Sequence, residues 1–240
     1  GEHLLSLINQ VLDLSKIEAG KMTLNEAAFD LYGLLNDVVD LFRLRAKEKQ
    51  LQLVFDCAAD VPRYVQTDEV KLRQVLINLL HNAIKFTKEG EVSLRVSEFK
   101  ALKNSDSQKF RPSDSQKFRL SDSQKFRRPD SQKFRRSDSQ KLSNSKALRF
   151  EVEDTGPGIA PEELQYLFEA FMQTATGRKT QEGTGLGLPI SQKFVQLLGG
   201  DIQVESEVGR GTKLTVDIPM WIVDASAIDR ADGAENVLNH

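Results

Sequence analysis

Polar side chains at helical spacing, from position 71 to position 85, could hold a metal ion and phosphate groups. Asn78 and Asn82 are four residues apart, so on a helix their amides face the same side, and Lys85 follows one turn later. Amide oxygens are hard, neutral ligands that suit Mg²⁺, which takes its other ligands from water and nucleotide phosphates. Taken alone, the pattern fits the solvated face of an ordinary amphipathic helix better.

Two glycine-containing segments could bring the backbone close to a ligand. In Asp154-Thr-Gly-Pro-Gly-Ile159 the glycines permit a turn, and the Asp can accept a hydrogen bond from an exocyclic amine. A tight turn without a ligand explains this segment equally well. The second segment, Gly183-Thr-Gly-Leu-Gly-Leu188, precedes a predicted helix, where free backbone amides and the helix dipole form an anion site.

The second glycine segment is neither of two common phosphate motifs. A dinucleotide fingerprint requires glycine where Leu188 stands, directly after a strand, but residues 173–182 are polar and loop-like. A P-loop requires Gly-Lys-Ser/Thr, but Gly183 is followed by Thr184. The segment therefore belongs to another kind of phosphate site.

The elements that must position these residues follow from hydrophobic periodicity and capping residues. Helices are predicted over 3–18, from 31 to beyond 42, over 69–86, over 162–168 and over 187–198. Gly20 is the predicted stop of the first helix, Asp30 the predicted cap of the second, and Asp68 the residue that opens the third. Strands are predicted over 22–29, 51–55, 91–98, 147–153, 201–205 and 212–218. Because strands and helices mix without regular alternation, the pattern predicts an α+β fold with helices on a sheet. The apolar stripe of the first helix is too wide for a lone helix and predicts a partner helix.

An eight-residue repeat separates two of the predicted strands. Asp-Ser-Gln-Lys-Phe-Arg begins at Asp106 and recurs at Asp114, Asp122 and Asp130. Residues 104–146 carry 12 basic and 5 acidic side chains, whereas the other 197 residues carry 21 and 30. One Phe per repeat offers too little apolar surface to offset the entropy of ordering, so we expect a disordered insertion. Binding of nucleic acid or acidic membranes is the disfavoured alternative, because each repeat retains an Asp.

Composition excludes several classes of protein. No stretch approaches the roughly 18 apolar residues that cross a bilayer, and the N-terminus has no signal-peptide pattern. Cys57 is the single cysteine, so we expect neither an intrachain disulfide partner nor a cysteine-based metal cluster.

Five motifs in order resemble those of the bacterial sensor histidine kinases of hybrid type, members of the GHKL superfamily. They are Asn78-Leu-Leu-His-Asn82-Ala-Ile-Lys-Phe-Thr87, Asp154–Ile159, Phe168-Glu-Ala-Phe171, Gly183–Leu188 and Gly209-Arg-Gly-Thr212. The resemblance implies a two-layer α/β sandwich with a mixed sheet, the Bergerat ATP-binding fold, preceded by one dimerisation-bundle helix. Residues 1–20 would be that helix, 21–219 the ATP-binding domain with its insertion at 104–146, and 220–240 a C-terminal linker.

The resemblance also implies roles for individual residues, with ATP and Mg²⁺ as cofactors. Asn82 would ligate Mg²⁺ with help from Asn78, Lys85 would face the phosphates, and Phe86 would pack by the adenine. Asp154 would hold the adenine amine, and Thr212 would lie near the base. Gly156 and Gly158 would shape the pocket, and Gly183, Thr184, Gly185, Leu186 and Gly187 would form the phosphate cradle. Phe168 and Phe171 would anchor a lid from which Arg178 or Lys179 reaches the γ-phosphate.

None of the three histidines of the chain lies where the family's phosphate-accepting histidine is expected. His3 lies on the second bundle helix, whereas the family's acceptor lies on the first, and His81 and His240 lie elsewhere. We therefore expect a cytoplasmic kinase fragment that phosphorylates a histidine outside this chain, in cis or trans within a homodimer. A response regulator receiver domain would then take the phosphate. A GHKL-type ATPase or a degenerate binding module is the alternative. An ATPase is disfavoured, because an amide at Asn78 cannot take a proton from water.

Overall fold

The structure is a computed structural model that describes residues 2–99, 145–173, 177 and 184–225. The helices are α1 (Glu2–Glu18), α2 (Leu31–Glu48), α3 (Glu69–Phe86), α4 (Pro161–Leu164) and α6 (Gly187–Leu197). The strands are β1 (Ala27–Asp30), β2 (Gln52–Cys57), β3 (Tyr64–Thr67), β4 (Glu91–Phe99), β5 (Ser145–Asp154), β6 (Asp201–Glu207) and β7 (Gly211–Ile222).

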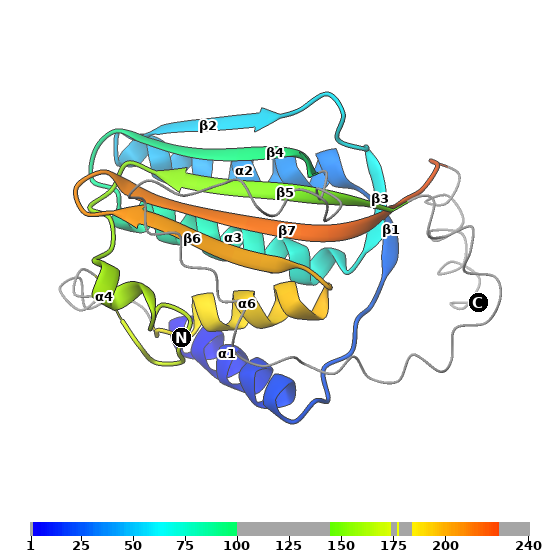
Figure 1. The fold of residues 1–240 in the computed structure, drawn as a ribbon, viewed down its shortest axis with the longest axis horizontal. Coiled ribbons are helices and arrows are strands. Elements are labelled where there is room, and N and C mark those ends of the chain that lie inside the picture. Colours follow the sequence, from blue (N-terminus) through cyan, green and yellow to red (C-terminus); the bar gives the residue numbers. More distant parts are fainter. Residues whose placement is uncertain (1, 100–144, 174–176, 178–183, 226–240) are drawn as a thin grey trace, which may run out of the picture.

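The seven strands form one mixed sheet in the order β1-β3-β7-β5-β4-β2, and β6 pairs with β7 beside that path (Figure 1). Only β2 and β4 are parallel, and the other described pairs are antiparallel. The long strand β7 pairs with β5 on one edge, and with β6 and then β3 on the other. The sheet therefore brings β3, from the first third of the chain, beside the end of β7.

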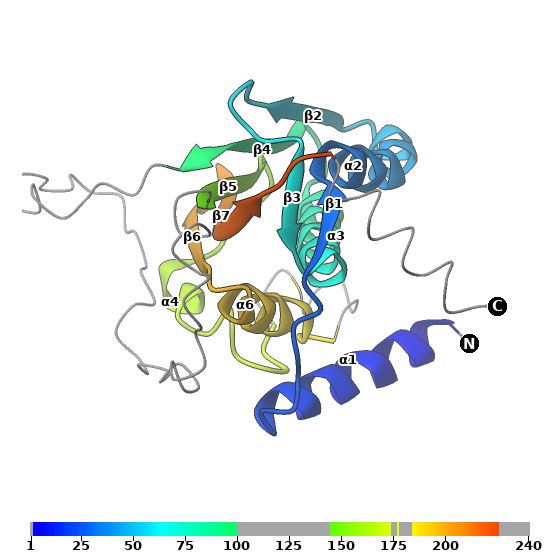
Figure 2. The ribbon, with the colours of Figure 1, turned by 90° about the vertical axis from the view of Figure 1, so that its right-hand side faces the viewer.

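Helices α2, α3 and α6 cover one face of the sheet (Figure 2). Along β5, Leu148, Phe150 and Val152 are buried beneath them, because alternate side chains of a strand point to the same face. The opposite face carries charged pairs, including Arg149 with Asp217 and Arg95 with Glu153. One apolar and one charged face make this the two-layer α+β sandwich that the sequence predicts.

The predicted caps of the two central helices are confirmed. The Asp30 carboxylate accepts a hydrogen bond from the Gly33 N–H at 3.1 Å at the start of α2. Asp68 accepts one from the Lys71 N–H at 3.0 Å at the start of α3. Both satisfy backbone donors that a helix leaves without partners in its first turn. Each cap is a local contact, so the helix starts could be predicted from sequence.

Several predicted boundaries are wrong. In place of the strand predicted over 22–29, the structure has the shorter strand β1, Ala27–Asp30. In place of the helix predicted over 162–168 it has the single turn α4, Pro161–Leu164. The strand β3 was not predicted, because its four residues, Tyr64–Thr67, are too few to show alternation. Strand β7, predicted over 212–218, runs from Gly211 to Ile222, because it continues to pair with β5 and β3.

The eight-residue (octad) repeat lies in the chain between two strands that are neighbours in the sheet. Strands β4 and β5 pair along eight residues, from Val92 opposite Asp154 to Phe99 opposite Ala147. The repeat joins them at the end of the sheet that is farther from Asp154. Residues 100–144, on which the prediction of disorder rests, lie outside the described part of the chain. Strand β5 begins at Ser145, two residues inside the range predicted for the insertion.

The apolar residues of helix α1 lie in two different environments. Leu14 and Ile17 pack against the hydrophobic core, and the helix lies beside α6 (Figure 2). Ile8, Val11 and Leu12 are exposed on another part of its surface. The helix ends at Glu18 and is followed by Gly20, whose φ of 63° favours glycine, with backbone hydrogen bonds typical of a glycine C-cap. The wide stripe is therefore partly explained by the domain's own core, and the remainder is available to a partner helix.

Asp68 supports a prediction about stability and pH. The side chain is buried, and it accepts from the Asn25 N–H at 2.8 Å and from Lys71 Nζ at 2.6 Å, besides its cap bond. Burial opposes its ionisation, but the hydrogen bonds from Lys71 and Asn25 prevail and lower its pKa below the ordinary value. Asp68→Asn should therefore reduce the free energy of unfolding at neutral pH by about 1–3 kcal/mol.

The same pKa fixes the direction of the pH dependence. A carboxyl whose pKa is lowered on folding stabilises the fold above its unfolded pKa, and this contribution is lost as the pH falls through the folded value. Urea unfolding at neutral pH and at about pH 3 should show the deficit of Asp68→Asn shrinking on acidification. Asp40→Asn, in an exposed pair with Arg43, is the control and should change little. A deficit that is unchanged by pH would contradict this account of Asp68.

Candidate functional site

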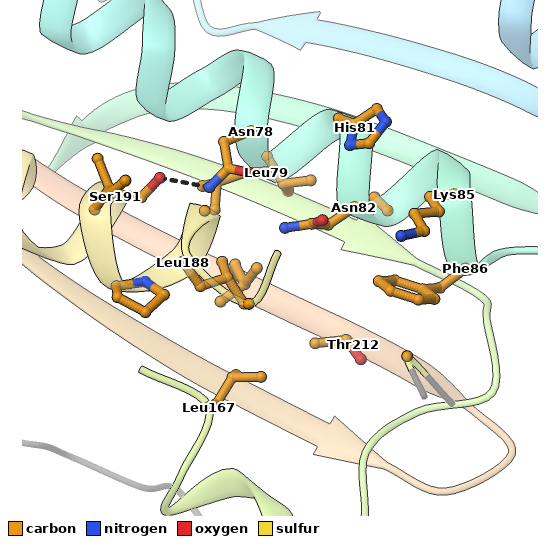
Figure 3. A pocket seen from close by; sticks show the side chains of 18 of the residues that line it. Asn78, Leu79, His81, Asn82, Lys85, Phe86, Leu167, Leu188, Ser191 and Thr212 are labelled. Atoms are coloured by element: carbon orange, nitrogen blue, oxygen red, sulfur yellow. Dashed lines mark hydrogen bonds between the residues drawn. The ribbon is translucent and has the colours of Figure 1, made fainter. Parts of the chain in front are cut away.

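A cavity of about 620 Å³ lies where α3, the end of β5, the start of β7 and the N-terminus of α6 meet (Figure 3). Residues that are far apart in sequence line it together. Of the residues predicted from sequence, the cavity is lined by Asn78, Asn82, Lys85, Phe86, Asp154, Gly158, Thr184, Gly185, Gly187 and Thr212. Three of the five sequence motifs thus contribute most of the predicted residues to one site, and a fourth contributes Thr212.

Helix α3 supplies the polar side of the cavity. Asn78, Asn82 and Lys85 stand on the same side of α3, and Figure 3 shows Asn82 and Lys85 directed toward the cavity. Lys85 Nζ lies 5.0 Å from the centre of the Phe86 ring, within the range of a cation–π contact. His81 is exposed and also lines the cavity.

Lys49 fixes the end of α3 that carries these side chains. Its Nζ donates to the carbonyl oxygens of Ile84 at 2.8 Å and Lys85 at 2.7 Å. A cation at this position satisfies terminal carbonyls and opposes the negative end of the helix dipole. Sequence reasoning missed Lys49, because it lies 35 residues before Ile84 and only the packing of α2 against α3 brings the two together.

Asn78 joins α3 to α6. Its Nδ2 donates to Ser191 Oγ at 2.7 Å, the contact drawn dashed in Figure 3. A β-carbon at Gly187 would collide with Asn78 Oδ1, so this glycine allows the amide to approach the first turn of α6. Asn78 therefore links α3 to α6 through its Nδ2, while its Oδ1 lies close to the first turn of α6. Sequence reasoning missed Ser191, a buried polar residue on α6 whose neighbours are largely apolar.

Asp154 lies at the end of β5 and lines the cavity. Its Oδ1 accepts the Gly156 N–H at 2.8 Å, and a β-carbon at Gly156 would lie 2.7 Å from that oxygen. Burial raises the pKa of the Asp154 carboxyl above its ordinary value, against the opposing effect of hydrogen bonds from the Gly156 and Thr212 backbones. No cation pairs with Asp154 among the described residues. The carboxylate is thus an acceptor held in an environment that disfavours its charge.

Thr212 is oriented by Ser206, which sequence reasoning also missed. Ser206 Oγ donates its proton to the Gly211 carbonyl at 2.8 Å and accepts the Ile159 N–H at 2.8 Å. Because a hydroxyl has one proton, the 2.9 Å contact between Ser206 and Thr212 must use the proton of Thr212. The Thr212 oxygen therefore faces further groups only as an acceptor.

The second glycine segment comes close to the backbone of residues 171 and 172. Gly185 has a φ of 71°, and a β-carbon there would lie 2.8 Å from the Met172 carbonyl oxygen. The Phe171 N–H donates to the Gly185 carbonyl at 3.1 Å. Gly185 is therefore required both for its dihedral angle and for this approach.

Four predicted residues do not line the cavity. Gly156 lies beneath Asp154, Leu186 is fully buried in the core, and Phe168 packs partly buried against that core. Phe171 is 65% exposed and has a φ of 66°. Its backbone contacts Gly185 and its ring does not enter the core. Arg178, Lys179 and Gly183 lie outside the described residues.

Comparisons with known proteins identify the family. Residues 120–222 match the family of histidine kinase-, DNA gyrase B- and HSP90-like ATPases. Over 100% of its length the chain is similar to the circadian input-output histidine kinase CikA of Synechococcus elongatus, at 38% identity, and to the sensor protein GacS of Pseudomonas syringae pv. syringae, at 31%. The chain carries a histidine kinase ATP-binding catalytic domain. It spans about a quarter of these curated relatives, 26% of CikA and 24% of GacS.

A solved structure agrees with this assignment. The crystal structure of full-length ShkA in complex with AMPPNP has a TM-score of 0.66 and 31% identity, over 94% of this chain and 37% of that one. In the histidine kinase domain described here, the family match begins after α3, within the octad repeat. The pairing of β4 with β5 nevertheless joins the part of the chain before the repeat to the part after it. None of the described helices is long and apolar enough to cross a membrane.

Proposed function

We propose that the cavity binds ATP with Mg²⁺ and that the domain transfers the γ-phosphate to a histidine of a dimerisation helix, in cis or in trans within a homodimer. A response regulator receiver domain then takes the phosphate, and the reaction takes place in the cytoplasm. The observation that carries the proposal is a half-buried carboxylate, Asp154, that shares one cavity with amide and ammonium groups of α3.

The Asp154 end of the cavity suits an adenine base. Asp154 offers carboxylate oxygens and Thr212 offers a hydroxyl that accepts, so a ligand edge with an exocyclic amine is complementary to both. Apolar side chains of Val152, Ile159 and Leu214 line the cavity as well and suit a flat aromatic ring.

The opposite end suits the phosphates and their metal ion. Asn82 contributes an amide oxygen of the kind that Mg²⁺ accepts, and Lys85 adds a positive charge one turn later. Gly185 and Gly187 leave backbone exposed at the N-terminus of α6, where anions are favoured. Asn82 would be the principal ligand with help from Asn78, whose amide is held in place by the hydrogen bond from Nδ2 to Ser191.

Transfer to histidine is favoured over transfer to water. Bound Mg²⁺ would neutralise charge on the phosphates during the reaction. A neutral imidazole nitrogen forms the new N–P bond as the bond from the γ-phosphorus to the oxygen of the leaving ADP breaks. Water needs a general base, and the Asn78 amide cannot accept its proton. Lys85 and Asn82 orient the phosphates for either acceptor.

A titration with nucleotide, followed by an acceptor assay, tests this function. The chain should bind ATP and ADP, more tightly with Mg²⁺ than with EDTA. With radiolabelled ATP it should label a supplied histidine-bearing helical hairpin from a sensor kinase, giving an acid-labile phosphoprotein. An absence of nucleotide binding would refute the site itself. Binding with steady phosphate release and no labelling of any histidine would instead identify an ATPase.

A further inference from the structure

Gln10 of the bundle helix lies at the phosphate end of the cavity, and we propose that it binds the terminal phosphate of ATP. This inference rests on the proposed function. It makes α1 part of the nucleotide site, with Gln10 distinguishing ATP from ADP. Gln10 was not among the residues that the sequence singled out.

The packing of α1 directs Gln10 toward the catalytic domain. Leu14 and Ile17 follow Gln10 by four and seven residues, so the three share one face of the helix. Leu14 and Ile17 pack against the core beside α6, and Gln10 lines the cavity itself. The exposed residues Ile8, Val11 and Leu12 occupy other parts of the surface of α1. The same contacts that dock the helix therefore place its amide in the site.

A hydrogen bond with the glycine segment orients the Gln10 amide. Thr184 Oγ1 donates to Gln10 Oε1 at 2.9 Å, and it accepts the Leu186 N–H at 3.2 Å. With Oε1 engaged as the acceptor, the two N–H donors of Gln10 Nε2 remain. Among the described residues Nε2 has no hydrogen-bond partner, and the side chain is half-buried. The half-buried donor is thus available to an anion in the cavity.

The position of Thr184 determines which part of a nucleotide Gln10 meets. Thr184 precedes Gly185 and Gly187, and Gly187 abuts Asn78, so this corner belongs to the phosphate end. Asp154, proposed to hold the base, pairs with Thr212, which Figure 3 shows away from Asn78 and Ser191. A donor contributed from a separate helix, beyond the glycine segment, suits the outermost phosphate. ADP lacks that phosphate and leaves Gln10 without a contact.

Gln10→Glu tests the proposal with little change in size. The carboxylate still accepts the Thr184 hydroxyl, but it offers no N–H donor and repels phosphate. We expect the dissociation constant for a non-hydrolysable ATP analogue to rise about tenfold or more, the scale of one hydrogen bond to a charged group, and that for ADP to change less than twofold. Gln10→Leu, which removes the donor without adding charge, should show the same selective loss for the ATP analogue.

Asn9→Asp is the matched control, because Asn9 is exposed on α1 beside Gln10 and the change adds the same charge. It should leave the preference between the two nucleotides unchanged. Equal weakening of ATP and ADP binding in Gln10→Glu, or an equal loss of preference in Asn9→Asp, would overturn the assignment of Gln10. Failure of the wild-type chain to bind either nucleotide would instead refute the proposed function. Thermal unfolding of each variant identifies any loss that is due to misfolding.

Discussion

Replacing Asp154 by alanine is expected to weaken ATP and ADP binding by about 100-fold or more. The side chain is a half-buried acceptor, and its loss would leave the adenine amine without its proposed partner. Isothermal titration of the wild type beside Asp154→Ala measures the effect. An affinity within a factor of three of the wild type would refute the assignment of Asp154 to the base.

Asp154→Asn separates the role of the carboxylate from that of the fold. An asparagine oxygen can still accept the Gly156 N–H, as Asp154 Oδ1 does at 2.8 Å, so the local turn is retained. The amide nitrogen then meets the adenine amine, and two donors face each other. This variant should remain folded and bind adenine nucleotides weakly. It should also bind guanine nucleotides relatively better than the wild type does, because guanine carries a carbonyl where adenine carries its amine.

The pH dependence of binding follows from the same residue. Burial raises the pKa of Asp154, so on acidification the carboxylate takes up a proton at a higher pH than an ordinary aspartate does. The protonated carboxyl no longer offers two acceptor oxygens, and nucleotide affinity should fall as the pH passes through the raised pKa. In Asp154→Asn this decline should be absent. An identical pH profile in both proteins would show that another group is responsible.

Gly211→Ala is expected to be the most destabilising glycine substitution in the described part of the chain, at about 3–5 kcal/mol. Gly211 has a φ of 121°, and a β-carbon would collide with the carbonyl oxygen of Asp154, a backbone atom that cannot swing aside. The collision pushes β7 away from β5 at the pair formed by Asp154 and Thr212. Chemical denaturation should show the loss of stability, and nucleotide binding should weaken with it.

Gly209→Ala is the control for backbone strain. Gly209 also has a positive φ, 81°, but a β-carbon there meets nothing within 4 Å. Its substitution should cost only the strain of a left-handed residue, about 1–2 kcal/mol. The difference between the two variants measures the collision beneath the site. Equal losses would show that the contact between Gly211 and Asp154 does not limit stability.

Local chemistry explains which parts of the fold could be predicted from sequence. The caps at Asp30 and Asp68 and the stop at Gly20 satisfy backbone groups within a few residues. The sequence pattern that marks each of them therefore lies entirely within a short segment. Asn78, Asn82 and Lys85 also lie within two turns of one helix, so their common side could be predicted from their spacing. Strand β3 and the end of β7 are different, because the strands with which they pair, β1, β5 and each other, lie far from them along the chain. The length of each of these strands depends on the strands beside it in the sheet, and the local sequence does not record them.

The candidate site divides in the same way. The sequence by itself determined the residue types, since amides, glycines and an aspartate at given spacings suit a nucleotide wherever the chain folds around one. Tertiary structure alone decided that Phe171 is exposed, that Ser191 holds Asn78 across 113 positions, and that Gln10 meets Thr184 across 174. Helix and turn geometry is set by neighbours along the chain. A cavity is set by contacts between elements, and no local pattern records them.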